Sequence, residues 1–302
     1  MPPFPLAGEF AALATSIFFS IAPTLFTFSV RLVGPQIVNR TRLLIATVIL
    51  MVIHTLIYGG ALPWLATPTQ WQWLTVSGLI GLALGDVALF QAFANIGARL
   101  SMLLFSLAPI LGSILGWFLL SEELTSIQIL GIGVTLAGVL WVVSEQQAEG
   151  PNKIERRTYT SGLFFALLAA IGQASGLIAA KLGLANLPVL SGQVIRMLAA
   201  TLAIWAWALF RGQGTQTLAR LREKPLAGRY ILLASVFGPV IGVWFSLAAV
   251  KYAEVGVAST LMSLPPILLI AIGYFFFKER VSARSIIGTV IALCGVGILF
   301  LA

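Results

Sequence analysis

Residues 104–142, LFSLAPILGSILGWFLLSEELTSIQILGIGVTLAGVLWV, and residues 261–301, LMSLPPILLIAIGYFFFKERVSARSIIGTVIALCGVGILFL, are two versions of one pattern. Each begins with a proline inside an apolar run, continues through a bulky segment to an acidic residue, and ends in a segment punctuated by glycine. An offset of 157 residues places Pro109 on Pro266 and keeps this register along both stretches. A register kept over tens of residues indicates an internal repeat.

The repeat extends beyond these two stretches toward the start of each half. The same offset places two glycines, Gly81 and Gly85, on Gly238 and Gly242. Four-residue spacing of small residues is typical of closely packed helices in membranes, so we expect all four glycines to lie at helix contacts. With an offset of 154, Arg42 and Thr47 fall on Arg196 and Thr201.

The composition excludes a water-soluble globular protein. The 302 residues are 59% hydrophobic and only 9% charged, with a mean hydropathy of +1.00, whereas soluble domains average about 25% charged residues. Apolar runs long enough to cross a bilayer recur along the chain. We predict an all-α polytopic membrane protein with ten spans, at residues 6–29, 37–58, 71–94, 98–121, 125–144, 160–181, 188–210, 230–250, 256–277 and 283–302.

The most charged linker divides the ten expected spans into two sets of five. It defines a first repeat at 1–147, a cytoplasmic linker at 148–158 and a second repeat at 159–302. Because each repeat has an odd number of spans, the second must enter the membrane in the opposite sense to the first. Inverted repeats around a central cavity are typical of secondary transporters.

The distribution of basic residues predicts the orientation. Of the 18 lysines and arginines, all but Lys181, Arg196 and Lys251 fall in the expected loops of one side or at the span ends beside them. Basic loops stay in the cytoplasm, so we expect a multi-pass protein of the inner membrane with both termini in the periplasm. The net charge of +8 is then explained by contacts with anionic lipid headgroups, and nucleic acid is not an expected partner.

The sequence contains no recognisable catalytic or metal site. It has one histidine, one cysteine and ten acidic residues, most of them in loops, without a zinc-protease motif, a hydrolase triad or a phosphate-binding loop. The short stretch GQGTQT at 212–217 is expected in a loop. We therefore expect neither an enzyme nor a bound cofactor or metal.

Asp86 is the only acidic residue deep in an expected span. An ionised carboxylate is costly in hydrocarbon, so it should face a watery cavity or a partner. In a cavity it could take up a proton or bind an ammonium group of the substrate; otherwise it would tie two helices together. Arg42 is expected to extend to the nearest interface. Arg196 opposes the charge bias, so it either extends likewise or holds a carboxylate or an internal acid.

Further substrate contacts are expected from a few polar and aromatic side chains within the spans, namely Gln91, Gln173, Trp244 and Tyr252. Packing is the alternative role for each. Gln173 is preferred because Gly172 and Gly176 beside it permit close backbone approach.

Pro109 and Pro266 occupy matching places in the fourth and ninth expected spans. Proline removes a helix hydrogen bond and kinks a helix interior. We therefore expect a kink in both spans, which serves either packing or a hinge.

The two quoted stretches resemble the drug/metabolite transporter superfamily, and in particular proteins with two EamA repeats. The resemblance covers the whole chain in span number and repeat, and general similarity is greatest to the YddG-type amino-acid exporters. It implies ten helices, a central cavity and export of amino acids or related metabolites, but it identifies no substrate residue. Where the first half has Ser-Glu-Glu at 121–123, the second has Lys-Glu-Arg at 278–280.

The expected function is therefore secondary transport of a small solute, most closely an amino acid, by alternating access in a protein expected to act as a monomer. A multidrug or nucleotide-sugar-type carrier of the same superfamily is the alternative. An intramembrane enzyme would need a paired acid and base or metal ligands at membrane depth, which the sequence lacks.

Overall fold

The computed structural model describes residues 6–120, 125–146, 155–184, 186–243, 245–246, 249, 261–262, 264–277 and 282–301. All regular secondary structure in these ranges is helical. In the first half the helices are α1 (Ala7–Val33), α2 (Pro35–Tyr58), α3 (Pro68–Ser77), the π-helix η1 (Gly78–Gly85), α4 (Asp86–Phe105), α5 (Ala108–Leu120) and α6 (Ser126–Gln146). In the second half they are α7 (Arg156–Gly183), α8 (Val189–Phe210), α9 (Gln213–Glu223), α10 (Pro225–Ser235), the π-helix η2 (Val236–Gly242), α13 (Pro265–Phe277) and α14 (Ala283–Leu301).

Within the described residues, seven helical segments are long and apolar enough to cross a membrane. Two of them are composite, because α3, η1 and α4 join into one segment and α10 continues into η2. Two shorter apolar helices, at Pro265–Phe275 and Ala283–Ile298, lie where further spans are expected. The structure therefore supports a polytopic membrane protein, and the number of ten spans stays a prediction.

Prolines and glycines mark the ends of several helices. Proline stands in the first turn of α2, α3 and α10, where its missing N–H has no helical partner to lose. Thr67 caps α3 by accepting a hydrogen bond from the backbone N–H of Gln70, whose side chain accepts one from Thr67 in return. Gly59 ends α2 in the left-handed conformation, which glycine adopts without a steric penalty.

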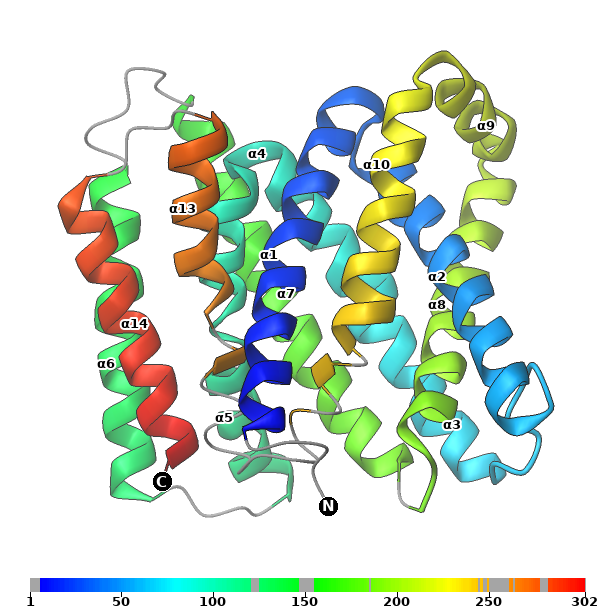
Figure 1. Cartoon of the computed structure of the whole chain (residues 1–302), viewed down its shortest axis with the longest axis horizontal. Coiled ribbons are helices and arrows are strands. Elements are labelled where there is room, and N and C mark those ends of the chain that lie inside the picture. The colour runs from blue at the N-terminus through cyan, green and yellow to red at the C-terminus, as the bar shows by residue number, and fades with distance from the viewer. Residues whose placement is uncertain are drawn as a thin grey trace.

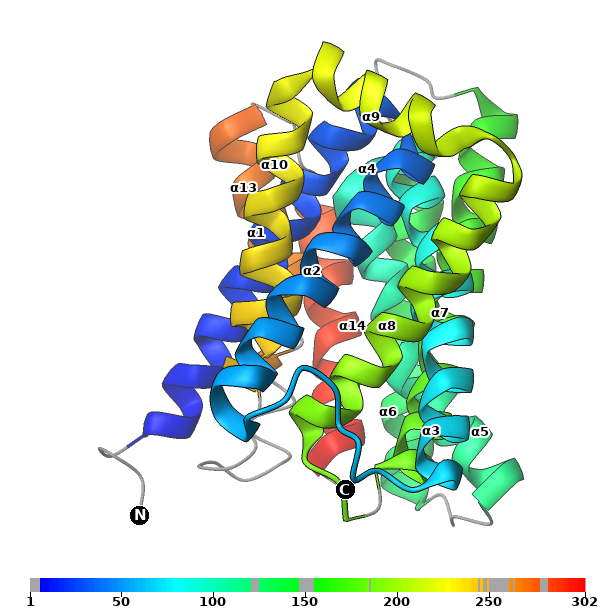
Figure 2. The ribbon, with the colours of Figure 1, turned by 90° about the vertical axis from the view of Figure 1, so that its right-hand side faces the viewer.

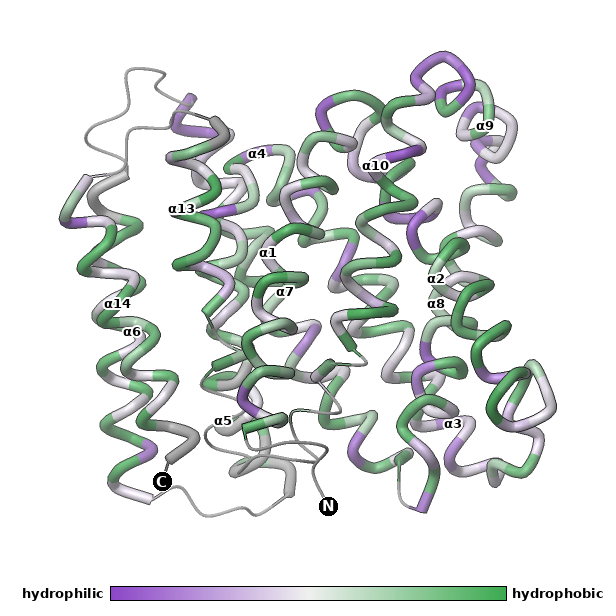
Figure 3. The backbone as a smooth tube through the Cα atoms, in the orientation of Figure 1, coloured by the Kyte–Doolittle hydropathy of each residue, from purple (hydrophilic) through white to green (hydrophobic). Residues whose placement is uncertain are grey.

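Most helices run along one common direction, while α9 lies across one end of the bundle (Figures 1 and 2). The pair α6 and α14 forms one edge, the pair α2 and α8 forms the other, and α1, α4, α7 and α10 lie between them (Figure 1). Hydrophilic residues concentrate toward the two ends of the bundle, as expected where a chain crosses a bilayer (Figure 3).

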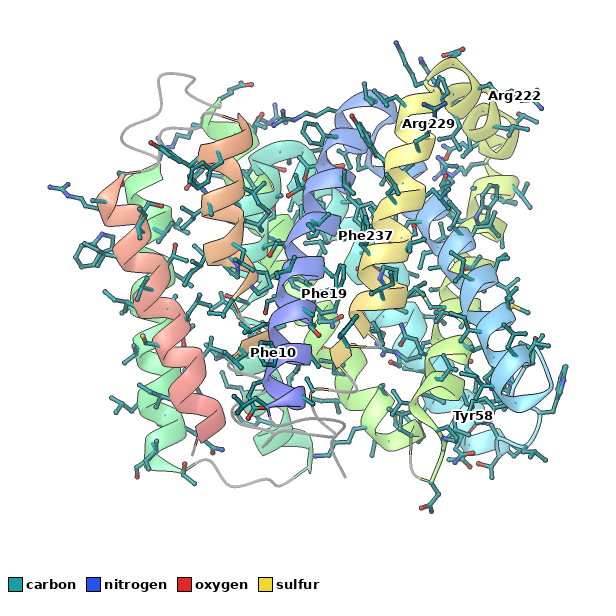
Figure 4. The ribbon with its side chains drawn as sticks, viewed as in Figure 1. Phe10, Phe19, Tyr58, Arg222, Arg229 and Phe237 are labelled. Carbon is teal, nitrogen blue, oxygen red and sulfur yellow. The ribbon has the colours of Figure 1, made fainter. Side chains whose placement is uncertain are left out.

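The first helix begins and the last helix ends at the same end of the bundle, opposite α9 (Figure 1). Arg222 and Arg229 lie at the α9 end, and Tyr58 lies at the other (Figure 4). The basic segment and the two chain ends are therefore on opposite sides.

The expected proline kinks are absent. In the fourth expected span, the helix stops at Phe105 and α5 starts at Ala108, so Pro109 stands in a first turn. In the ninth, Leu264 is not helical and α13 starts at Pro265, so Pro266 is again in a first turn. Proline loses no helical hydrogen bond at such a position, and each span is therefore interrupted instead of bent.

The expected loop at 212–217 also differs from the structure. The stretch 212–217 is not a loop, because five of its six residues open α9, which follows α8 directly. The loop at 212–217 was expected because of its glycines and polar side chains, although glutamine is a good helix former. The helix α7 begins at Arg156, within the expected linker, and the repeat boundary at 159 stays a prediction.

Residues related by the repeat meet one another at both edges of the bundle. The hydroxyls of Thr47 and Thr201 are 2.7 Å apart. His54 follows Thr47 along α2 and contacts Ser191, which precedes Thr201 along α8. The helices α2 and α8 therefore run in opposite directions and cross at equivalent residues.

The pair α6 and α14 has the same property at the other edge. A β-carbon added at Gly138 would lie 2.6 Å from the carbonyl oxygen of Gly288, and one added at Gly295 would lie 2.7 Å from that of Gly131. The offset of 157 relates Gly138 to Gly295 and Gly131 to Gly288, so the repeat converts each of these contacts into the other. Because an early residue of one helix meets a late residue of the other, α6 and α14 are also antiparallel.

The two π-helices occupy matching registers and each packs on the first helix of the opposite half. A β-carbon added at Gly176 in α7 would lie 2.8 Å from the α-carbon of Gly81 in η1. In the second half, a β-carbon at Gly238 in η2 would lie 3.0 Å from the β-carbon of Ala22 in α1. Figure 4 labels Phe19 and Phe237 in the region where α1 and η2 cross. The helices of the two halves are thus interleaved.

Candidate substrate site

A buried ion pair joins α2 to α4 in the first half. The Nη2 atom of Arg42 donates to Oδ2 of Asp86, and the two side chains are only 10% and 9% exposed. Asp86 stands at the first residue of α4, directly after η1. Among the alternatives for Asp86, the structure shows an interhelical tie.

Two aromatic rings complete the surroundings of Arg42. Its guanidinium carbon lies 5.7 Å from the ring centre of Phe26 and 5.2 Å from that of Phe90, within the range of cation–π attraction. The two rings meet edge to face at 5.1 Å. The expectation that Arg42 extends to the interface is therefore wrong, because a carboxylate and two ring faces stabilise its charge inside the bundle.

Arg196 lies on α8 and is equally buried. Its Nη1 donates to Oε1 of Gln193 at 3.2 Å, while its Nε has no hydrogen-bond partner among the described residues. Asp86 and Arg196 also attract each other electrostatically. Of these two arginines, only Arg42 is hydrogen-bonded to Asp86.

The close crossing of η1 and α7 lies beside Arg196. A β-carbon added at Gly81 would be 3.8 Å from Nη2 of Arg196 and 3.5 Å from the α-carbon of Gly176. The Ser77 hydroxyl stabilises this crossing by donating to the carbonyl oxygen of Gly176 at 2.5 Å. Gln173, half-buried, lies within the same turn of α7. The structure thus brings Arg196 beside Gly81, while Gln173 lies on the helix that crosses there.

Gly85 belongs to the same crossing, because a β-carbon on Gly172 would lie 2.9 Å from its α-carbon. Gly242 has a comparable position in η2, where a β-carbon would lie 2.9 Å from Cδ1 of Phe19. All four glycines selected from the repeat therefore stand at close helix contacts.

Gln91 belongs to a separate polar chain. Its amide nitrogen donates to Oδ1 of Asn95 at 3.0 Å, and the amide nitrogen of Asn95 donates to the hydroxyl of Ser161 at 3.3 Å. This chain connects α4 with α7. Trp244 and Tyr252 lie outside the described residues, as does the side chain of Pro109, while Pro266 is buried.

A groove of about 590 Å³ lies between α1 and α13. Its polar side chains are Ser20 and Thr24, whose hydroxyls donate to backbone carbonyls of their own helix. The α1 residues that line the groove recur every three or four positions and therefore share one face of the helix. Phe26, whose ring contacts Arg42, is not among them, so the groove and the ion pair contact different faces of α1. It is an apolar surface and not part of the charged site.

Sequence reasoning selected Asp86 and Arg196 but missed the pairing of Asp86 with Arg42 and the amide beside each arginine. Asn39 stands three residues before Arg42, as Gln193 does before Arg196. The repeat could have revealed these amides, because the offset of 154 that relates Arg42 to Arg196 also relates Asn39 to Gln193.

Comparison with known proteins places the chain among membrane transporters. The EamA-like transporter family model matches residues 6–144 and 160–301. An uncharacterized transporter of Archaeoglobus fulgidus is 22% identical over 228 residues, which cover 76% of this chain and 75% of that protein. A protein of known crystal structure superimposes with a TM-score of 0.60 and 19% identity, covering 98% of this chain and 95% of that one. The likeness to the solved structure concerns the fold alone.

Proposed function

The chain belongs to the EamA-like transporter family, and from this premise we propose that it exports amino acids or closely related metabolites across the inner membrane by alternating access. Two EamA-like matches account for almost the whole length. The transported solute would bind near the middle of the bilayer, between the two halves.

The antiparallel crossings at equivalent residues are the observation that supports alternating access. Thr47 meets Thr201 at one edge, and Gly138 and Gly295 exchange contacts at the other. Helices related in this way fit a pseudo-twofold axis in the plane of the membrane, as in inverted repeats. Two such halves can exchange conformations, which would open the central site to each side of the membrane in turn.

The charged cluster supports a small zwitterionic solute. The carboxylate of Asp86, which pairs with Arg42, and the guanidinium of Arg196 are both buried, and an amino acid bears the complementary pair of charges. We propose that Asp86, Gln91, Gln173, Arg196, Trp244 and Tyr252 contact the solute.

One observation favours a second candidate. The groove between α1 and α13 is large enough for a drug-sized molecule and is lined mainly by aliphatic and aromatic side chains. A multidrug carrier would use such a surface, whereas an amino-acid carrier would use the charged cluster. A nucleotide-sugar-type carrier remains the other form of this alternative.

Reconstitution would test the proposal. Purified protein in liposomes is given radiolabelled amino acids, cationic drugs and sugars, with and without a pH gradient. We expect amino acids to move faster than in protein-free liposomes, and a response to the gradient would identify coupling to protons. The Gly176→Val variant forces α7 away from η1 and should be inactive, whereas Gly228→Ala, at a position with open space around it, should retain transport. Flux of the drugs alone would favour the multidrug alternative, and no flux of any solute would refute a carrier.

A further inference from the structure

The two halves contain two copies of one arginine site. In the first, Nη2 of Arg42 lies 3.5 Å from Oδ1 of Asn39. In the second, Nη1 of Arg196 donates to Oε1 of Gln193 at 3.2 Å. The offset of 154 relates both members of each pair, and it also relates the two threonines that meet between α2 and α8.

The copies differ in their acidic residue. Asp86 follows Gly85 directly at the end of η1 and neutralises Arg42. The residue that follows Gly242 at the end of η2 is Val243. The second site therefore has the arginine and its amide neighbour, but a valine where its own carboxylate would be.

This difference leaves positive charge without a full counter-charge inside the bundle. Asp86 forms an ion pair with Arg42, whereas no described carboxylate forms one with Arg196. The Nε atoms of both arginines lack a hydrogen-bond partner within the described part of the chain. A buried guanidinium without a paired anion is strongly unfavourable. A buried site that keeps such a group is suited to an anion that enters from outside.

We propose that Arg196 binds the carboxylate of the transported solute, which takes the place that Asp86 has beside Arg42. A guanidinium matches a carboxylate because its planar donors can form two parallel hydrogen bonds. Gln193 holds one nitrogen of Arg196, while Nε is buried and lacks a hydrogen-bond partner among the described residues. The glycines at the crossing of η1 and α7 leave backbone instead of side chains beside the guanidinium. This inference rests on the proposed transport function and specifies its substrate class as small carboxylates.

The test compares each carboxylate with its amide. The purified full-length protein in detergent is heated with the twenty common amino acids and, separately, with their primary amides, which lose only the carboxylate charge. We expect at least one amino acid to raise the unfolding temperature, with the matched amide binding at least about tenfold more weakly, since hydrogen bonds to charged groups dominate this contact. The same pairs are then compared for flux into liposomes.

Three variants separate binding from folding. Arg196→Gln should abolish the preference for the carboxylate, and Arg196→Lys should retain part of it. Arg40→Gln is the matched control, because Arg40 is also buried but binds the backbone carbonyls of Gln36 and Gln213, and it should keep the preference. The comparison of amino acids with their amides uses the wild-type protein, so it does not depend on whether any variant folds.

The outcomes distinguish this inference from the transport function. If no amino acid stabilises the protein, if amides bind equally well, or if Arg196→Gln keeps the preference, the carboxylate site is refuted, even when the liposomes show transport. Carboxylate-specific stabilisation that depends on Arg196 without any flux would instead refute the carrier and leave the site standing.

Discussion

Arg42 and Asp86 are removed from water together, so the charge of each depends on the other. Taking an ion into an apolar interior costs several kcal/mol, which its partner repays only when the geometry is good. Phe26 and Phe90 add ring faces to the guanidinium but no counter-charge. The loss of one charge therefore leaves the other without compensation.

We expect Asp86→Asn and Arg42→Gln each to destabilise the protein by about 3–5 kcal/mol, because each removes one partner of the buried ion pair. The double variant should lose less than the sum, since it removes both charges. Thermal unfolding in detergent of the two single variants and the double variant measures this coupling.

The exposed pair of Arg220 and Glu223, 3.4 Å apart, is the control. Their substitution by glutamine should change stability by no more than about 1 kcal/mol, because solvent screens such pairs. Strict additivity of the two buried substitutions would contradict a direct pair.

At the scale of helices, small residues determine how closely two segments approach. Gly138 and Gly295 allow the backbones of α6 and α14 to touch. Without β-carbons at these points, dispersion contacts extend along the crossing, which is a main source of helix association in lipid.

Gly138→Ala should destabilise this pair by about 1–3 kcal/mol, because the added methyl would meet the backbone of Gly288 and Ala292. Gly133→Ala, in the same helix with nothing nearby, should be neutral or stabilising by up to about 1 kcal/mol. Thermal unfolding compares the two. Equal effects would mean that α6 and α14 do not pack through Gly138.

The sequence predicted helices, their approximate bounds and the glycine contacts, because apolar runs and small-residue spacing are local properties. The interruption of the span at 98–121 was missed, because a proline inside an apolar run is compatible with either a kink or a new start. The helix α9 was missed because its polarity resembles that of a loop. The pairing of Arg42 with Asp86 joins residues 44 positions apart, a relation that local patterns do not contain.

At the scale of the whole molecule, Thr47 and Thr201 lie where the two halves cross. In a variant with Cys294 replaced by alanine, Thr47→Cys and Thr201→Cys should form a disulfide on mild oxidation. A protease site inserted at 148–154 makes this visible, since the cut halves then stay joined until reduction.

The pair Thr47→Cys and Thr289→Cys is the control, because α2 and α14 lie at opposite edges (Figure 1), and it should not crosslink. Crosslinking of both pairs, or of neither, would contradict this arrangement of the halves.

The charge distribution makes a separate prediction about orientation. Arg222 and Arg229 lie opposite the end where α1 begins and α14 ends (Figure 4). Because basic segments stay in the cytoplasm, a C-terminal alkaline phosphatase fusion should be active and a C-terminal green fluorescent fusion should be dark. The reverse pattern would place both termini in the cytoplasm.

Asp86 without an acidic counterpart at Val243 also affects the equilibrium between the two open forms of a carrier. In a carrier with two identical halves, the inward-open and outward-open forms would be symmetry mates of equal energy. An acid present in only one half contributes to the loss of that degeneracy, so the unloaded carrier should favour one of the two forms. Val243→Asp should bring the two populations nearer to parity, which distances between spin labels at each end of the bundle would measure. Unchanged distances would show that the bias has another origin.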